Sequence, residues 1–195
     1  MNKINPNNLN FLNDDVNTVA KALLGCELER IIKGKIIKVR IVETESYDQD
    51  DLASHAFGGK TKRNSVMYGD FGHLYVYFTY GMHYCCNIVT GSAGYGSGVL
   101  IRAVEPLIGE SIMDANRKGI GGLNVSNGPA KLCQALDIDM QMSGHDLTTN
   151  PFRLIPKLHL PESEIITTTR IGISKAKDSL RRFYIKGNAY VSKPW

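Results

Sequence analysis

The chain has 195 residues, of which 43% are hydrophobic and 22% are charged, and its formal net charge at pH 7 is +4. This composition excludes disordered, collagen-like and coiled-coil proteins, and a single hydrophobic core commonly spans about 100–200 residues. We therefore expect residues 1–195 to form one domain, with the Asn-rich residues 1–10 flexible. The charge alone favours an anionic partner only weakly, because clustering of charge sets the field that attracts DNA.

Neither a membrane span nor a metal site is expected. The longest apolar runs, such as residues 74–78 and 98–101, are far shorter than the roughly 18 residues of a transmembrane helix, and residues 1–10 lack a signal-peptide core. The four cysteines form no C-x-x-C pair, and the five histidines lack H-x-E or H-E-x-x-H spacing. We expect reduced thiols, no metal, no other cofactor and a cytoplasmic location.

The first third of the chain predicts a helix and then a hairpin. Asn13 or Asp14 is suited to cap a short helix that ends at Gly25. A β-hairpin is expected over residues 26–47, with its turn at residues 33–35.

Two carboxylates lie on the second strand of this hairpin. Because side chains alternate along a strand, one face is expected to carry Ile37, Val39, Ile41, Glu43, Glu45 and Tyr47. A carboxylate at the end of an apolar row is partly desolvated, which strengthens it as a base. The alternative is a structural carboxylate paired with Arg or Lys. Spacing alone does not decide whether Glu43 or Glu45 has either role.

The middle of the chain predicts a long surface loop and further strands. Residues 48–70 are polar and include a basic run at residues 60–63, so we expect a functional loop. Strands are expected over residues 74–80, 84–90 and 99–104, with a Gly/Ser loop at residues 91–98.

Helices and late strands complete the predicted fold. A helix is expected over residues 107–117. A second helix should run to Leu136 from the capping sequence of residues 126–129, whose free N–H groups could receive a phosphate. Late strands are expected over residues 167–174 and 181–191, joined by a turn that contains Lys175 and Lys177. The order predicts an α+β fold: one mixed domain with a curved, mainly antiparallel β-sheet and peripheral helices.

Residues 75–84 form the densest aromatic stretch of the chain. Most such stretches are core, but four tyrosines each need a partner for a hydroxyl when they are buried. Tyrosines on a half-open face beside basic loops are typical of nucleic-acid sites, where bases stack and phosphates meet cations. Both interpretations stay open on these grounds.

Six blocks in order carry a resemblance to a known family. They are Arg40–Tyr47, His55, Leu74–Met82, Cys86–Ile88, Leu100–Pro106 and Asn127–Leu136. These blocks resemble the alkyladenine (3-methyladenine) DNA glycosylase family over about residues 12–192. The resemblance implies a monofunctional N-methylpurine DNA glycosylase, in which water attacks the sugar.

The resemblance also implies roles for single residues. Glu45 matches the base that activates the water, and Arg102 matches a basic residue beside the reacting nucleotide. Tyr47 and His55 resemble two walls of a pocket for a flipped base, and Tyr77 resembles the aromatic residue that stacks on the base.

Further matches concern the duplex and selectivity. Tyr80, with Met82 beside it, looks like the wedge that enters the duplex, and Asn87 matches the residue that crowds a purine 2-amino group. Contacts to the DNA backbone are expected from three basic residues, Lys62, Arg63 and Lys131.

The expected reaction is the hydrolysis of N-glycosidic bonds of alkylated or deaminated purines. The candidate bases are 3-methyladenine, 7-methylguanine, hypoxanthine and ethenoadenine, and the expected partner is damaged double-stranded DNA bound by a monomer in a bacterial cytoplasm or nucleoid. Two alternatives from other classes are a non-catalytic nucleic-acid-binding module, which Glu45 disfavours, and a nucleoside hydrolase, which needs no wedge such as Tyr80.

Overall fold

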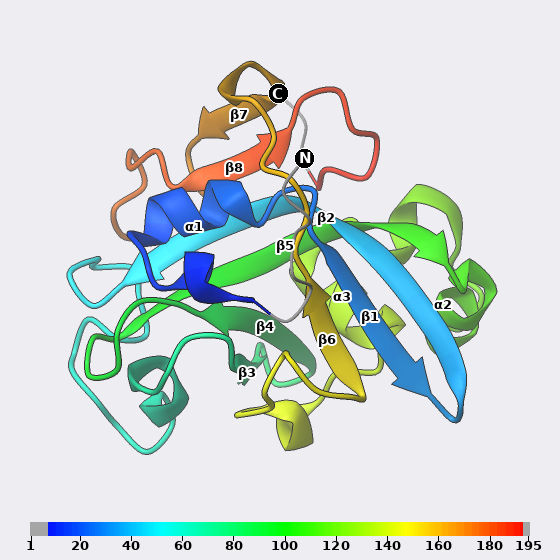
Figure 1. The fold of residues 1–195 in the computed structure, drawn as a ribbon, viewed down its shortest axis with the longest axis horizontal. Helices are drawn as coiled ribbons and strands as arrows, with labels where there is room; N and C mark the ends of the chain where they lie inside the picture. The colour runs from blue at the N-terminus through cyan, green and yellow to red at the C-terminus, as the bar shows by residue number, and fades with distance from the viewer. Residues whose placement is uncertain (1–7, 193–195) are drawn as a thin grey trace.

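The fold is a curved antiparallel sheet with helices at its periphery. A computed structural model describes residues 8–192 (Figure 1). The strands are β1 (Glu27–Ile32), β2 (Lys35–Asp48), β3 (Leu74–Thr79), β4 (His83–Val89), β5 (Ser97–Ile108), β6 (Phe152–Ile155), β7 (Ile165–Thr168) and β8 (Arg182–Ile185), and the α-helices are α1 (Val16–Ala22), α2 (Glu110–Asn116) and α3 (Pro129–Ala135). This confirms the predicted fold class.

Strand β2 organises the sheet. The strand order is β3-β4-β5-β2-β1-β6, and β8 pairs with both β2 and β7. The first part of β2 pairs with β1, and residues 43–45 of β2 pair with β8, while β5 follows the other edge of β2. Every named pairing is antiparallel. Because β2 is long and its partners change along its length, its carboxyl end can lie among segments from distant parts of the sequence.

A β-bulge in β2 corrects the predicted single row of side chains. The register between β2 and β5 shifts between Ile41 and Glu43 and again between Glu43 and Thr44. Ile41 belongs to the hydrophobic core, whereas after the shifts Thr44 faces the core side and donates a hydrogen bond to the Ala20 carbonyl of α1. An extra residue in one strand reverses which side chains face the core. Glu43 and Glu45 therefore lie on the face opposite Ile37, Val39 and Ile41.

The helix boundaries differ from the predicted ones. Asp15, not Asn13 or Asp14, caps α1, because its side chain accepts from the amides of residues 17 and 18. Strand β5 continues through Pro106 to Ile108, so α2 begins only at Glu110. Helix α3 begins at Pro129 as expected, but no side chain caps it. The predicted capping side chain at residues 126–127 is therefore wrong.

The late strands are shorter than predicted. Strands β7 and β8 end within the predicted ranges, and residues 171–175 form a loop that lines the cavity described below. Strand β6 was not predicted; it pairs with the edge strand β1. Of residues 1–10, expected to be flexible, the first seven lie outside the described residues, and Leu9 is buried.

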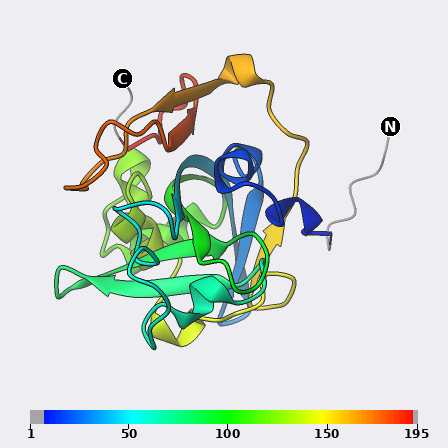
Figure 2. The ribbon, with the colours of Figure 1, turned by 90° about the vertical axis from the view of Figure 1, so that its left-hand side faces the viewer.

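The predicted surface loop of residues 48–70 is packed against the sheet. Ala56, Met67 and Tyr68 form a second small core with Tyr75 and Val89. In Figure 2 the β3–β4 hairpin and the loop that follows β7 project toward the same side of the molecule. That side carries the cavity mouth residues Tyr80 and Lys175.

Candidate active site

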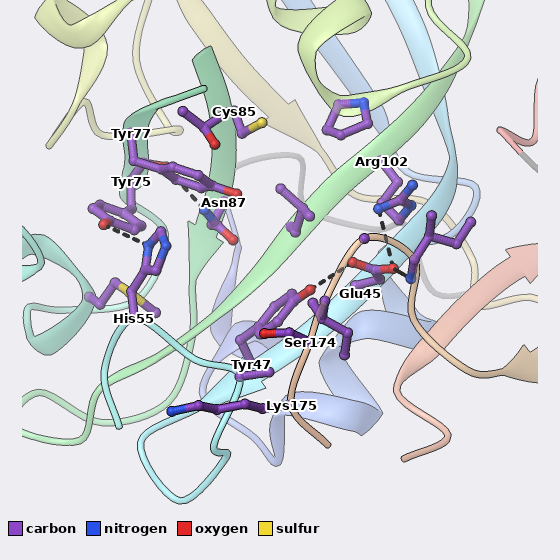
Figure 3. Close-up of a pocket in the computed structure, with 18 of the residues that line it drawn as sticks. Glu45, Tyr47, His55, Tyr75, Tyr77, Cys85, Asn87, Arg102, Ser174 and Lys175 are labelled. Carbon is purple, nitrogen blue, oxygen red and sulfur yellow. Dashed lines mark hydrogen bonds and ion pairs between the residues drawn. The ribbon is translucent and has the colours of Figure 1, made fainter. Parts of the chain in front are cut away.

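A cavity of about 530 Å³ lies on the face of the sheet opposite the main core (Figure 3). Its walls come from β2, β3, β4 and β5, from the loop after β2 and from residues 171–175. The lining includes Glu45, Tyr47, Leu52, His55, Tyr75, Tyr77, Tyr80, Cys85, Asn87, Arg102 and Lys175. The structure thus brings together all the predicted catalytic and base-binding residues.

Glu45 is completely buried at the cavity wall. Its Oε1 accepts a hydrogen bond from the Ile171 amide at 2.8 Å and is 3.2 Å from Nη1 of Arg102. Its Oε2 accepts a hydrogen bond from the Tyr47 hydroxyl at 2.8 Å. A buried carboxylate is costly unless it is paired and hydrogen-bonded, and Glu45 meets both conditions.

Glu43 lies on the same strand face but has a different environment. It is also completely buried, and its oxygens accept from Nε of Arg102 at 3.1 Å, from Nε of Arg182 at 2.7 Å and from the amide and hydroxyl of Ser192. Of the two carboxylates, only Glu45 lines the cavity. Glu43 therefore pairs with two buried arginines and does not face the cavity.

Arg102 joins the two carboxylates. Burial disfavours its charged form, but the negative charges of Glu45 and Glu43 outweigh burial and raise the pKa of Arg102. The guanidinium stays charged beside both carboxylates.

Tyr47 is fixed from two sides. Burial, followed by the negative charge of Glu45, raises the pKa of the Tyr47 hydroxyl, so the hydroxyl stays protonated and donates to Glu45. On the ring, the guanidinium of Arg170 lies 4.6 Å from the centroid. Arg170 is held by a buried ion pair with Asp51, in which Nη2 donates to Oδ1 at 3.0 Å, and by the Ser46 carbonyl. This pair joins two segments that sequence patterns did not connect.

Aromatic side chains line the other end of the cavity. The rings of His55 and Tyr77 meet edge to face with centroids 4.5 Å apart, and Tyr75 stacks on Tyr77 at 5.8 Å. Asn87, on the neighbouring strand, is 4% exposed, and its side chain donates to the Tyr75 carbonyl at 3.5 Å. Flat aromatic walls with polar groups at their edges suit a planar ligand such as a purine.

The β3–β4 hairpin extends beyond this wall. At its tip Tyr80 is 81% exposed and Met82 is 69% exposed. Tyr80 has a positive φ of 51°, as has Gly81 at 67°, so the tight turn itself presents the tyrosine ring to solvent. Exposure of two large apolar side chains beside a cavity is typical of an interaction surface.

The three predicted backbone-contact residues have different surroundings. Lys62 is exposed on the loop after β2. Arg63 Nη2 donates to the Phe78 carbonyl of the hairpin at 3.3 Å, and Lys131 donates to the side chains of Asn124 and Asn127. The last two are therefore tied to protein groups, although Lys131 still lies in the first turn of α3, beside the cavity residue Pro129.

Several cavity residues were missed by the sequence patterns. Cys85 lines the cavity beside Asn87 two residues along β4, and burial raises the pKa of its thiol to about 11. Tyr75 was noted only as part of the aromatic stretch. Residues 171–175 were predicted as strand, and nothing local to them indicated a cavity wall. Alternation along β4 could have indicated Cys85, because Asn87 was already a candidate.

The comparisons with known proteins decide the family. The model of the family "Methylpurine-DNA glycosylase (MPG)" matches residues 10–189. The chain belongs to this family. Methylpurine-DNA glycosylases cut N-glycosyl bonds in DNA, so the chain is a DNA glycosylase, a hydrolase that takes part in DNA repair. The family resemblance inferred from the six sequence blocks is confirmed.

Three similar proteins are each named "Putative 3-methyladenine DNA glycosylase". The protein of Carboxydothermus hydrogenoformans is 52% identical over 184 residues, which cover 94% of this chain and 96% of the relative. That of Methanoculleus marisnigri is 46% identical over 187 residues, with the same two coverages. That of Francisella tularensis is 47% identical over 177 residues, which cover 89% of this chain and 92% of the relative.

Within residues 8–192 no helix has the length and apolar character to cross a bilayer. In the same range no three His, Cys, Asp or Glu side chains converge as a metal site.

Proposed function

We propose that this methylpurine-DNA glycosylase is monofunctional: it flips alkylated or deaminated purines out of duplex DNA and hydrolyses their N-glycosidic bonds with water activated by Glu45. The proposed bases are 3-methyladenine, 7-methylguanine, hypoxanthine and ethenoadenine. The relatives' names include the first of these bases.

The observation that carries the proposal is the hydrogen-bond capacity of Glu45. A carboxylate oxygen can accept two hydrogen bonds. Among the described residues, Oε1 contacts Ile171 and Arg102, whereas Oε2 accepts only from Tyr47. Oε2 therefore keeps one acceptor position at the cavity wall, which suits a water molecule that donates to it.

The proposed hydrolysis needs Glu45 as its one proton acceptor. The water oxygen forms a bond to C1′ of the sugar, the bond from C1′ to the purine nitrogen breaks, and the electron pair leaves with the purine. The water proton passes to Glu45. The sugar develops positive charge in such reactions, and the carboxylate stabilises it. A cationic alkylated purine leaves as a neutral base, whereas a neutral purine must take up a proton.

The aromatic end of the cavity suits the flipped base. In this proposal Tyr47, His55 and Tyr77 enclose the base, and Asn87 meets its edge. Flipping the base out of the duplex costs a few kcal/mol of lost stacking and pairing. Insertion of Tyr80 and Met82 into the duplex offsets part of this cost. Lys62, with its exposed amine, suits a phosphate contact. The protein would act as a monomer in the cytoplasm or nucleoid.

Base release from single-lesion duplexes tests the proposal. Wild-type protein should free purine bases from otherwise identical duplexes that each carry one of the four lesions and leave an abasic site with an intact strand. Release by wild type together with strand cleavage at the abasic site would contradict the monofunctional mechanism. Release of none of the four bases would contradict the substrate class.

A further inference from the structure

His55 has one ring nitrogen in contact with protein and one without a protein partner. Its Nδ1 lies 3.1 Å from the Tyr75 hydroxyl (Figure 3). Among residues 8–192, Nε2 of His55 has no hydrogen-bond partner, and the residue lines the cavity. The group that Nε2 presents to a ligand depends on which nitrogen carries the proton, because a neutral imidazole has one donor and one acceptor.

The surroundings of His55 favour the neutral ring. Partial burial lowers the pKa of His55, whose residue surface stays exposed at the cavity, and the positive charge of Arg63 lowers it further. No carboxylate contacts the ring among the described residues; its ring neighbours are Tyr75 and Tyr77. One nitrogen therefore carries a proton and the other does not.

The Tyr75 hydroxyl decides between the two nitrogens. Tyr75 is 1% exposed, so its hydroxyl proton needs an acceptor nearby. Burial raises the pKa of Tyr75, while the positive charge of Arg63 opposes the rise. The positive charge of Arg63 attracts the hydroxyl oxygen and repels its proton, so the proton points to His55 Nδ1, 3.1 Å from the oxygen. Nδ1 must then be the acceptor.

Arg63 is itself fixed by the hairpin. Its Nη2 donates to the Phe78 carbonyl at 3.3 Å, which holds the guanidinium at β3, the strand that carries Tyr75. Asn64, the next residue, donates to the His55 carbonyl at 2.8 Å and so ties the two loop segments together. Arg63 is thus placed to act on the cavity through Tyr75.

We propose that Arg63 and Tyr75 are positioning residues that fix the tautomer of His55 with the proton on Nε2, so that the cavity presents an N–H donor to an acceptor atom of the flipped nucleotide. The acceptor is a purine ring nitrogen or an oxygen of the adjacent phosphate. This inference rests on the proposed function for its ligand, but the tautomer is a property of the free protein.

Nitrogen NMR of the free protein tests the tautomer directly. At a pH above 7, the ¹⁵N shifts of His55 should show a protonated Nε2 and an unprotonated Nδ1 in wild type. Tyr75→Phe keeps the ring but removes the donor, and Arg63→Met removes the guanidinium, so both should make the Nδ1–H tautomer detectable. Lys60→Met, an exposed change on the same loop, should leave the wild-type pattern. A wild-type ring with the proton on Nδ1 overturns the proposal.

Binding to DNA tests whether the donor meets an acceptor. A Gln amide nitrogen can replace Nε2–H, whereas Leu cannot. His55→Leu should weaken binding to a hypoxanthine duplex by roughly three- to tenfold, the value of one hydrogen bond, and His55→Gln should retain most of the affinity. Equal losses in the two variants would refute a donor role, even if wild type releases hypoxanthine and the proposed function holds.

Two modified duplexes distinguish the sources of the acceptor. A methylphosphonate 5′ to the lesion removes phosphate charge, and a deaza purine removes a ring nitrogen. The modification that weakens wild-type binding but not His55→Leu binding identifies the acceptor. If neither the phosphate nor any purine ring nitrogen shows this pattern, Nε2–H contacts no acceptor and the proposal fails. Failure of wild type to release any base would instead contradict the proposed function, and the NMR result would still stand.

Discussion

Replacing Glu45 by Gln tests which of the two buried carboxylates of β2 acts as the general base. Gln has the same shape and keeps a carbonyl oxygen for the Ile171 amide, but it cannot take a proton from water. Loss of a general base typically lowers the rate by about 10²–10⁴-fold. Arg102 keeps Glu43 as a partner in this variant, so we expect a folded protein that binds lesion DNA with nearly wild-type affinity and releases bases at least 100-fold more slowly, a threshold set by that range.

Glu43→Gln is the matched control. Glu43 accepts from two buried arginines and Ser192, and removing one partner of a buried ion pair costs about 3–5 kcal/mol. For a domain of this size each kcal/mol lowers the Tm by about 2–4 °C, so a decrease of roughly 6–20 °C is expected. Near 20 °C, where the variant is still folded, it should retain more activity than Glu45→Gln.

Single-turnover release of hypoxanthine and thermal unfolding should be measured for both variants. Single-turnover rates exclude effects of product release, and duplex affinity measured in parallel separates binding from chemistry. If Glu45→Gln released bases at the wild-type rate, the assignment of Glu45 as the general base would be refuted. A stable but inactive Glu43→Gln protein would show that the two roles are exchanged.

Three further predictions concern the wedge, selectivity and the Arg170–Asp51 pair. Tyr80→Ala should weaken excision from duplexes by about 1–3 kcal/mol, the value of one stacked aromatic, and spare single strands; equal losses on both substrates would make Tyr80 a pocket residue. Asn87→Ser should raise release of guanine-derived bases relative to hypoxanthine, and an unchanged ratio in a folded variant would place selectivity elsewhere. Asp51→Ala leaves the buried guanidinium of Arg170 without its carboxylate, so calorimetry should show a loss of about 3–5 kcal/mol; unchanged stability would mean that solvent reaches Arg170.

The sequence predicted much of the fold because strand periodicity is local. Alternating residues and turn signals located β1 through β5, and the six family blocks identified Glu45, Tyr47 and Asn87 as candidate site residues. Helix ends were less certain. Pro106 suggested the end of a strand, yet β5 continues past it to Ile108. The chain turns at Gly109, which has a φ of 81°, and the helix begins only after this residue.

The long-range contacts of the site could not be read from periodicity. The pattern of β2 placed both carboxylates on the core-facing row. Only pairing with β5 shows the bulge that turns them to the opposite face, where Glu45 lines the cavity. The Ile171 amide reaches Glu45 from 126 residues further along the chain. Arg170 joins Asp51, and residues 171–175 close the cavity, although locally they resembled a strand.

The sequence by itself determined the family, the fold class and the candidate base-binding residues, since residue types in ordered blocks carry that information. The tertiary structure decided which carboxylate meets the cavity and which groups hold it. It also tied Arg63 to the hairpin and brought its positive charge close to Tyr75. The physical reason is that a side chain's environment depends on segments brought together by folding, and a strand's own alternation does not report the strands and loops packed against it.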